Sequence, residues 1–390
     1  MYKGRLEDAR GSSPSRVTRV LVFNFFGGVM DRGIQLYARD IAQCMRHMGL
    51  DVVKLRCPLW LRAAPRPLRN VLFVVFEQLV APLVRAVRGC ALTVYPYNSV
   101  GIIDTLLGRS VLVIHDLIGN QRQNGALAAR YIRATQAVHR RLRRPICAAS
   151  EHTLRQLKRI EAFRRCPLHL WTNPFYTFEE VISESGIQTR EDGGPLRILL
   201  CSGIGANKDY GGALRLFASS KVLENAQLRV VGFGDDAHLA RRRLAKLPPS
   251  VRERITVLPR LSLHELVAEY RASHLVWVHS RKEGFGRFVV EARLAGRPVL
   301  ASNISAFRRL RHHGVHYYRK DSFDAAVKRA LEAPPAPSPS TELYHEPLER
   351  AVREVLAAMR VEIRAPRSRP SRDTLPATAA AAIIEERNQA

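Results

Sequence analysis

The sequence predicts an α/β protein of two consecutive domains, each built on a parallel β-sheet. Its 390 residues exceed one ordinary domain and fit two domains of about 150 to 200 residues each. Short apolar runs alternate with longer stretches of helical periodicity, which is typical of parallel βαβ layers. A pattern of strand, glycine turn and helix near the N-terminus is repeated after a polar, glycine-containing stretch at residues 191–194. We therefore expect two Rossmann-like domains that face each other.

The first domain is expected over residues 1–180. Residues 19–26 (RVLVFNFF) predict its opening strand. Gly27 and Gly28 follow as a turn, and residues 33–48 have the apolar spacing of a helix. Further buried strands are predicted at residues 111–114 (VLVI) and 146–149 (ICAA).

The second domain is expected over residues 194–335. Residues 196–201 (LRILLC) repeat the opening strand, a turn follows at Gly203, and residues 212–220 predict the next helix. Further strands are predicted at residues 228–231, 255–258, 275–278 and 299–301.

A linker, a helix and a tail are expected after the second domain. Residues 334–340 (PPAPSPS) have the composition of a Pro-rich linker. Residues 347–363 predict an amphipathic helix that tolerates Pro347 in its first turn. Residues 364–390 are rich in Arg, Pro and Ala and predict a poorly ordered tail.

The chain is strongly basic, and the excess leans towards its first half. It holds 62 Lys and Arg against 35 Asp and Glu, and residues 1–180 hold 28 of these basic and 12 of these acidic residues. The resulting net charge of +27 attracts polyanions such as nucleic acid, anionic lipid headgroups or phosphorylated substrates. A general preference for Arg, with only nine Lys, is the alternative explanation.

The cysteines and the N-terminal residues favour the cytoplasm. The six Cys are scattered, without a C-x-x-C pair or zinc-ligand spacing, as expected of buried apolar residues in a reducing compartment. Residues 1–15 are polar and lack the apolar core of a secretion signal. We expect a cytoplasmic protein.

Residues 71–84 (VLFVVFEQLVAPLV) suggest contact with a membrane surface. The stretch is strongly apolar, but it contains Glu77, and its 14 residues fall short of the roughly 20 that a membrane span needs. Arginines at both ends suit an amphipathic helix that lies on an anionic leaflet. A buried core helix with charged ends is the alternative. The flanking arginines are Arg62, Arg66, Arg69, Arg85 and Arg88.

The most informative motif is SRKEGFGRFVVEARLAGRPVLAS at residues 280–302. Its two carboxylates, Glu283 and Glu291, are separated by seven residues, a spacing that alone is common on solvated helix faces. Here it follows an apolar strand, and two glycines around an aromatic residue let backbone N–H groups approach a ligand closely. If a helix begins near residue 287, one carboxylate projects from the loop and the other from the helix. The loop consists of Gly284, Phe285 and Gly286.

This extended pattern closely resembles the retaining glycosyltransferases of family 4 with the GT-B fold, of the bacterial surface-polysaccharide type, whose hallmark is EGFG-x4-E-A-x3-G-x-P-V. The resemblance covers most of the chain and implies two facing Rossmann-like domains, a cleft between them, and a C-terminal helix that crosses back. It implies that Glu283 contacts hydroxyls of the donor sugar and that Glu291 holds the ribose hydroxyls. A carboxylate suits both roles because it accepts two hydroxyl hydrogen bonds.

The resemblance also implies roles for residues of the first domain. The turn at Gly27 and Gly28 should approach the donor phosphates and the acceptor, where backbone amides and a helix end favour negative charge. His115 and Asp116 end the strand VLVIHD and should point into the cleft, the His beside the reacting carbon. From the residues alone, a plain tight turn and a structural strand-end His are the alternatives.

In the second domain, Gly203 and Lys208 match the loop that clasps the pyrophosphate in this family. Such a Lys acts as a point charge that stabilises the departing diphosphate. The chain has Ile204 and Asn207 where the family usually adds an Arg, so either another cation replaces it or the leaving group is stabilised less. The candidate replacements are Arg260, Arg281 and Lys282.

The leading hypothesis is retaining transfer of a hexose from a nucleoside diphosphate sugar to a glycan or lipid-linked glycan at the inner face of the plasma membrane. The stretch TVYPYNSVG at residues 93–101 resembles mannosyltransferases of the family and favours GDP-mannose as donor. No Asp-x-Asp motif is present, so no metal cofactor is expected. A degenerate glycosyltransferase scaffold and a polyanion-binding protein are the alternatives. Nucleic acid is not an expected partner, because no helix-turn-helix, zinc-finger or aromatic RNA-binding pattern occurs.

Overall fold

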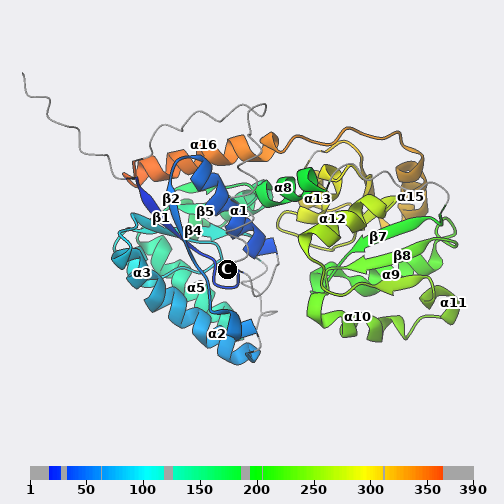
Figure 1. Ribbon diagram of the computed structural model, residues 1–390, viewed down its shortest axis with the longest axis horizontal. Coiled ribbons are helices and arrows are strands. Elements are labelled where there is room, and N and C mark those ends of the chain that lie inside the picture. The colour runs from blue at the N-terminus through cyan, green and yellow to red at the C-terminus, as the bar shows by residue number, and fades with distance from the viewer. Residues whose placement is uncertain are drawn as a thin grey trace, which may run out of the picture.

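The structure is a computed structural model that describes residues 17–27, 33–62, 64–117, 126–185, 194–203, 205–310 and 312–362. Gly28, Ile204 and the predicted tail at residues 364–390 lie outside the described residues. Two α/β domains lie side by side along the longest axis, and the last helix, α16 (Glu342–Ala358), runs along the first of them (Figure 1). The predicted division into two α/β units is therefore present.

The first domain contains a six-stranded parallel sheet in the order β2-β1-β3-β4-β5-β6. The opening strand ends three residues earlier than predicted, because the N–H of Gly27 donates to the Asn24 carbonyl oxygen (2.9 Å) and closes a turn. The strands are β1 (Arg19–Phe23), β2 (Asp51–Leu55), β3 (Leu92–Tyr95), β4 (Ser110–Ile114), β5 (Ile146–Ala148) and β6 (Leu168–Leu170).

Helices cover both faces of this sheet, because successive residues of a buried strand point to opposite sides. Val20 and Val22 of β1 contribute to the core under α1 (Gly33–His47) and α16. Leu21 and Phe23 contribute to the core on the other face. The helices of that second layer are α2 (Arg66–Val75), α3 (Ala81–Val87), α4 (Ile102–Leu106), α5 (Ala126–Arg141), α6 (Glu151–Arg159) and α7 (Glu161–Arg164).

The second domain repeats this plan with the strand order β12-β11-β10-β7-β8-β9, again parallel throughout. The strands are β7 (Arg197–Cys201), β8 (Gln227–Val231), β9 (Ile255–Val257), β10 (Leu275–Val278), β11 (Val299–Ser302) and β12 (Val315–Tyr318). One face is covered by α9 (Tyr210–Ser219), α10 (Ala237–Leu244) and α15 (Phe323–Glu332). The other is covered by α8 (Tyr176–Glu184), α12 (Leu263–Ala272) and α13 (Arg287–Leu294). Two single-turn helices, α11 (Pro249–Arg252) and α14 (Ser305–Arg308), complete the domain.

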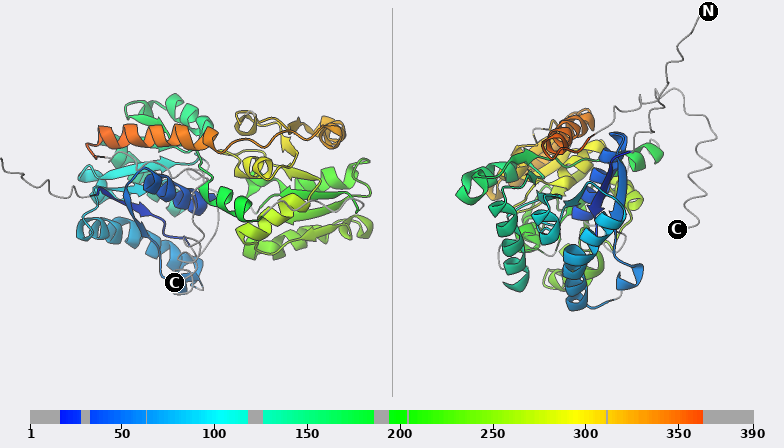
Figure 2. Two further views of the ribbon diagram at one scale, coloured as in Figure 1. Left: turned by 45° about the horizontal axis from the view of Figure 1, so that its top comes forward. Right: turned by 90° about the vertical axis from the view of Figure 1, so that its left-hand side faces the viewer.

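Helix α16 crosses back from the second domain to the first, as expected (Figure 2). It begins at Glu342, five residues before the predicted start at Pro347. The early first turn is held by packing, since Tyr344 lies 5.0 Å from the Phe175 ring and His345 stacks on Tyr176 at 3.7 Å. These contacts outweigh the hydrogen bond that Pro347 cannot donate inside the helix.

The predicted apolar helix forms and is longer than residues 71–84. Helix α2, a π-helical turn η2 (Phe76–Val80) and α3 follow one another without a break. Within the described part of the chain, Pro67–Val87 is the one helical stretch long and apolar enough to cross a membrane by length and composition. One side of the stretch packs on β1 and β3, whereas the other is exposed, so it is not the fully buried core helix of the alternative interpretation.

Candidate active site at the domain junction

The carboxyl ends of β4 and β5 meet the loop that follows β10. A Cβ on Gly284 would lie 2.5 Å from the His115 carbonyl oxygen and 3.0 Å from the Asp116 Cβ, so only glycine fits at this point. The Ser150 hydroxyl, which caps α6, also donates to the Gly284 carbonyl oxygen (2.6 Å). The structure thereby brings the two predicted motifs, one from each domain, into direct contact.

Glu283 lies in that loop and already has two partners. Its Oε1 accepts hydrogen bonds from Lys208 Nζ (2.6 Å) and from the Ser280 hydroxyl (2.6 Å). Lys208 ends the short 3-10 helix η4 (Ala206–Lys208), which follows β7 and Gly203. The carboxylate from the motif and the predicted phosphate-binding cation therefore lie together at the carboxyl ends of β7 and β10.

Glu291 is buried on helix α13, which directly follows this loop. Helix α13 begins at Arg287, as the motif predicts, with Gly286 at its N-cap in the left-handed conformation (φ 105°). The Glu291 carboxylate accepts from the Tyr270 hydroxyl (3.1 Å) and from Arg287 Nε (3.1 Å). The carboxylate is thus an acceptor that two protein donors already share.

Arg287 connects this carboxylate to the first domain. Its Nη2 donates to Asp40 on α1 (3.3 Å), and its Nη1 donates to the Pro174 carbonyl oxygen (3.1 Å). Its guanidinium also lies over the Phe175 ring at 4.6 Å. Asp40 is fully buried, and burial raises its pKa, an effect that Arg287 and Thr177 oppose. One side chain therefore ties α13, α1 and the interdomain segment together.

His115 is partly buried, and one of its ring nitrogens is buried without a hydrogen-bond partner among the described residues. Its ring packs edge-on against Tyr37 (4.6 Å), and it bonds the backbone of Pro96, which can only accept. Its Nε2 has no hydrogen-bond partner among the described residues, so Nδ1 carries the donated proton and Nε2 is an acceptor. Burial lowers the pKa of His115 to about 4, and the ring is neutral at pH 7. A neutral His of this tautomer accepts a hydrogen bond from a hydroxyl group.

Two further predicted site residues are Gly27 and Phe285. Gly27 lies in the turn after β1, and its neighbour Gly28 is outside the described residues. The Phe285 ring lies 6.1 Å from both the Phe175 and the Tyr344 rings, so its side chain packs at the domain junction.

Of the three candidate replacements for the missing phosphate-binding Arg, Arg281 lies beside the Lys208 loop. Its Nε donates to Asp209 (2.8 Å) and its backbone N–H to the Asn207 carbonyl oxygen (2.7 Å). Arg260 lies beside the Gly234 turn, where a Cβ would be 4.0 Å from its Nε. The Lys282 carbonyl oxygen accepts a hydrogen bond from the Asn207 side chain (3.1 Å).

Sequence reasoning missed several residues that build the site. Arg287 and Asp40 are the main ones, and the only local signal was the spacing of four residues between Arg287 and Glu291 on one helix. Asn98 is another: it has a left-handed backbone (φ 65°), and its side chain accepts from the His115 N–H (2.8 Å).

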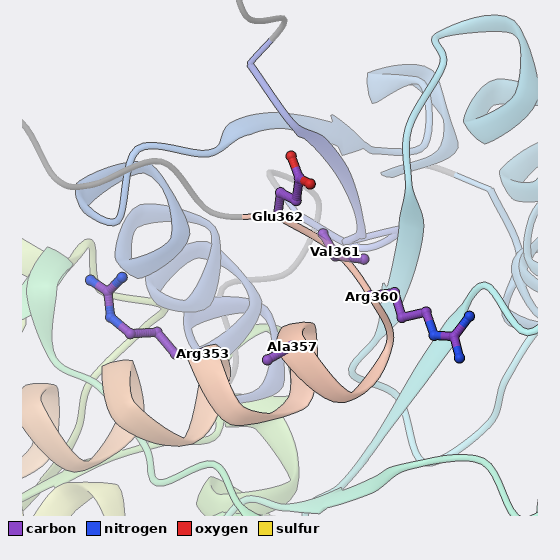
Figure 3. Close-up of a pocket in the computed structure, with 5 residues that line it drawn as sticks. All are labelled: Arg353, Ala357, Arg360, Val361 and Glu362. Carbon is purple, nitrogen blue, oxygen red and sulfur yellow. The ribbon is translucent and has the colours of Figure 1, made fainter.

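A surface hollow elsewhere in the molecule is separate from this site. Figure 3 shows it at the C-terminal end of α16, lined by Arg353, Ala357, Arg360, Val361 and Glu362. Among the described residues, no group of three or more His, Cys, Asp or Glu side chains is arranged to hold a metal ion.

Comparison with known proteins finds a family match in the second half of the chain. Residues 183–345 match the model of the family described as "Glycosyl transferases group 1". This match covers the second domain and less than half of the chain. Short stretches also match proteins named D-inositol 3-phosphate glycosyltransferase, with 33% identity over 91 residues for that of Mycolicibacterium gilvum and 47% over 51 residues for that of Rhodococcus jostii. These matches cover 22% and 13% of the chain, and the chain spans only 21% and 11% of those relatives.

Solved structures of glycosyltransferases share the fold of the whole chain. Sucrose-phosphate synthase from Thermosynechococcus elongatus aligns with a TM-score of 0.59 and 16% identity over 95% of this chain and 98% of that one. Anabaena HepE, solved in complex with UDP and glucose, aligns with a TM-score of 0.54 and 16% identity over 96% of this chain and 100% of that one. At this identity the likeness shows the fold, and it confirms the GT-B architecture that the motif implied.

Proposed function

We propose that the protein is a retaining glycosyltransferase that moves a hexose from a nucleoside diphosphate sugar to a hydroxyl of a glycan or lipid-linked glycan. The observation that carries the proposal is the contact of the Glu283–Gly284 loop with His115 and Asp116 across the domain junction. The group 1 family match and the shared fold support it. Of the neighbours, HepE was solved with UDP and with UDP-glucose.

The donor is proposed to bind with its ribose at Glu291, its diphosphate at Lys208 and its sugar between Glu283 and His115. Ribose hydroxyls would donate to the Glu291 carboxylate and share it with Tyr270 and Arg287. A sugar hydroxyl would donate to the His115 Nε2, which has no other partner among the residues that the structure describes. The contact with His115 gives a hydrogen-bond partner to a buried acceptor that has none, which favours binding of a hydroxyl-rich ligand.

The proposed chemistry needs no enzyme-bound intermediate. The bond between the anomeric carbon and the diphosphate oxygen breaks, and the acceptor oxygen bonds to the same face of that carbon. The acceptor proton passes to the departing diphosphate oxygen. Lys208, with Arg281 beside it, would stabilise the charge that develops there, and we propose that no metal cofactor is required. Full turnover in the presence of EDTA is expected, and loss of turnover that Mg²⁺ restores would contradict this part.

GDP-mannose is the proposed donor, on the resemblance of residues 93–101 to mannosyltransferases. A panel of GDP-, UDP- and ADP-hexoses tests it, because it ranks the bases and sugars directly. Preference for a UDP-sugar would replace the proposed donor and leave the proposed reaction class intact.

Glu283→Gln and Glu291→Gln test the reaction class. Each change keeps the size of the side chain and removes the charge that accepts hydroxyl bonds, so turnover is expected to fall by roughly tenfold or more, about 1.5 kcal/mol or more of lost stabilisation. Glu332→Gln, on an exposed helix end of the same domain, is the matched control and should behave as the wild type.

The anomeric coupling constant of the product, read by NMR, tests retention. Normal turnover in both site variants, or inversion at the anomeric carbon, would contradict the proposal. Nucleotide binding without turnover on any acceptor would instead support the scaffold alternative.

We also propose that the protein works in the cytoplasm and meets its acceptor at the inner face of the plasma membrane. The Arg-rich first domain suits an anionic surface, and a lipid-linked acceptor would lie there.

A further inference from the structure

An unusual stripe of exposed apolar side chains runs along the outer side of α2, η2 and α3. Its six members recur every three or four residues, as one face of a helix requires. Their exposed fractions range from 37% for Val75 to 76% for Val87. Soluble surfaces carry single exposed apolar residues routinely, but a contiguous row of this length marks an interaction surface. The members of the stripe are Leu68, Val71, Val75, Leu79, Leu83 and Val87.

Apolar side chains of neighbouring elements extend this surface. Helix α4 packs against η2, and its residues Ile103 and Leu106 are exposed, as is Leu107 at its C-cap. Trp60 precedes α2 in the chain and is 67% exposed, whereas the other two tryptophans, Trp171 and Trp277, are fully buried. Figure 1 shows α2, α3 and α5 on the same side of the first domain, opposite α16.

The part of the chain that carries the stripe is strongly basic. Residues 56–150 contain 14 Arg and no Lys, against only three acidic residues. Two of these three, Glu77 and Asp104, are fully buried, so they do not offset the arginines at the surface. Exposed arginines of this layer are Arg88, Arg109, Arg130, Arg133, Arg141 and Arg143.

We propose that this layer of the first domain is a docking surface for an anionic lipid bilayer, with the Pro67–Val87 helix lying flat in the interface. A bilayer offers acidic headgroups above an apolar interior, which matches an apolar stripe bordered by arginines. A second copy of the chain would place arginines against arginines. This surface adds membrane binding to the proposed function, and the binding of lipid does not depend on transfer activity.

The packing of the helix explains why it lies on the bilayer instead of crossing it. Phe73, Phe76 and Val84 on its inner side belong to the core beneath β1 and β3. Glu77 accepts from the Ser99 hydroxyl (2.6 Å) and from Tyr131. Insertion across a membrane would break this core and these hydrogen bonds, whereas docking of the outer side keeps them.

Vesicle flotation tests the proposal with the full chain. The wild type is expected to bind vesicles of phosphatidylcholine with one third phosphatidylglycerol, and to bind pure phosphatidylcholine at least about tenfold more weakly. Leu79→Asn with Leu83→Asn should reduce anionic binding by roughly tenfold or more, because two exposed leucines lose their apolar contact. Leu343→Asn is the matched control: its 62% exposure equals that of Leu83, but it lies on α16. It should bind as the wild type does.

Trp60 supplies a second readout that needs no label. Its fluorescence should shift to the blue on addition of anionic vesicles, and Trp60→Phe should abolish the shift, because the two buried tryptophans do not respond.

Unchanged melting temperature and nucleotide binding in the stripe variant would show that it folds and that the donor site is independent. Equal vesicle binding by the stripe variant and the Leu343→Asn control would overturn the proposal. A wild-type dimer that the stripe variant converts to monomer, without vesicle binding by either, would overturn it in favour of a second copy.

Discussion

His115 illustrates how burial determines the chemistry of a single side chain. Its Nδ1 proton is donated to a backbone carbonyl, and burial lowers its pKa to about 4, so that Nε2 is an acceptor over the whole physiological range. Because the folded pKa lies below the ordinary value of 6.5, the neutral ring contributes stability above about pH 6.5. That contribution is lost as the pH falls towards 4.

The expected result is therefore a His115 ring that does not titrate between pH 5 and 8, in the Nδ1–H tautomer. Two-dimensional NMR of the imidazole nitrogens measures both properties, with a His115→Asn variant to assign the signal. An ordinary pKa near 6.5, or a proton on Nε2, would contradict the role of an acceptor for a sugar hydroxyl.

Arg287 makes a contact that the sequence does not predict. The two glutamates of the motif were predicted because a strand, a glycine loop and a helix follow one another around them in the sequence. The partner of Arg287 in the first domain, Asp40, is 247 residues away in sequence, and no local pattern connects them. Only the folded arrangement shows that the arginine paired with Glu291 also joins the two domains.

At the scale of elements, most central strands were predicted, with β3 as the exception, and most edge strands were not. Strands β1, β4, β7 and β10 are short, continuous apolar runs that are buried on both faces. The strands β2, β6 and β12 lie at sheet edges and include charged or polar residues, so they lack such a run. The apolar helix was predicted, but its buried acidic residue and its π-helical turn were not.

Glu77, in that π-helical turn, makes a testable contribution to the pH dependence of stability. Burial raises its pKa to about 7 from the ordinary 4.5, although Ser99 and Tyr131 oppose the shift by donating to it. Between these two values the folded chain holds a proton that the unfolded chain has released. The free energy of unfolding should therefore fall as the pH rises through this window, by up to about 1.4 kcal/mol per pH unit.

Urea unfolding at pH 5 and pH 7 measures this dependence, and Glu77→Gln is the comparison because it cannot ionise. The wild type should lose more stability than the variant between the two pH values. An identical loss in both proteins would show that Glu77 does not hold a proton in the folded state.

At the scale of the whole molecule, two sheets of the same plan meet at the carboxyl ends of their strands. In open parallel sheets, ligands bind outside these ends. The junction is fixed from three sides: by Ser150 on the Gly284 loop, by Arg287 on Asp40, and by the first turn of α16 on the aromatic residues that precede α8. The lipid-facing layer proposed for the first domain lies on the face of the sheet opposite α16, so membrane contact leaves these three ties unchanged.

The central claim is that this junction binds a nucleoside diphosphate sugar through Glu291. Thermal unfolding with a panel of UDP-, GDP- and ADP-sugars tests it most directly. One member at about 100 times its dissociation constant should stabilise the wild type by roughly 2.7 kcal/mol. Glu291→Gln should lose most of this stabilisation, while Glu332→Gln keeps it. If no sugar nucleotide raises the melting temperature of the wild type, or if it raises that of Glu291→Gln equally, the claim is wrong.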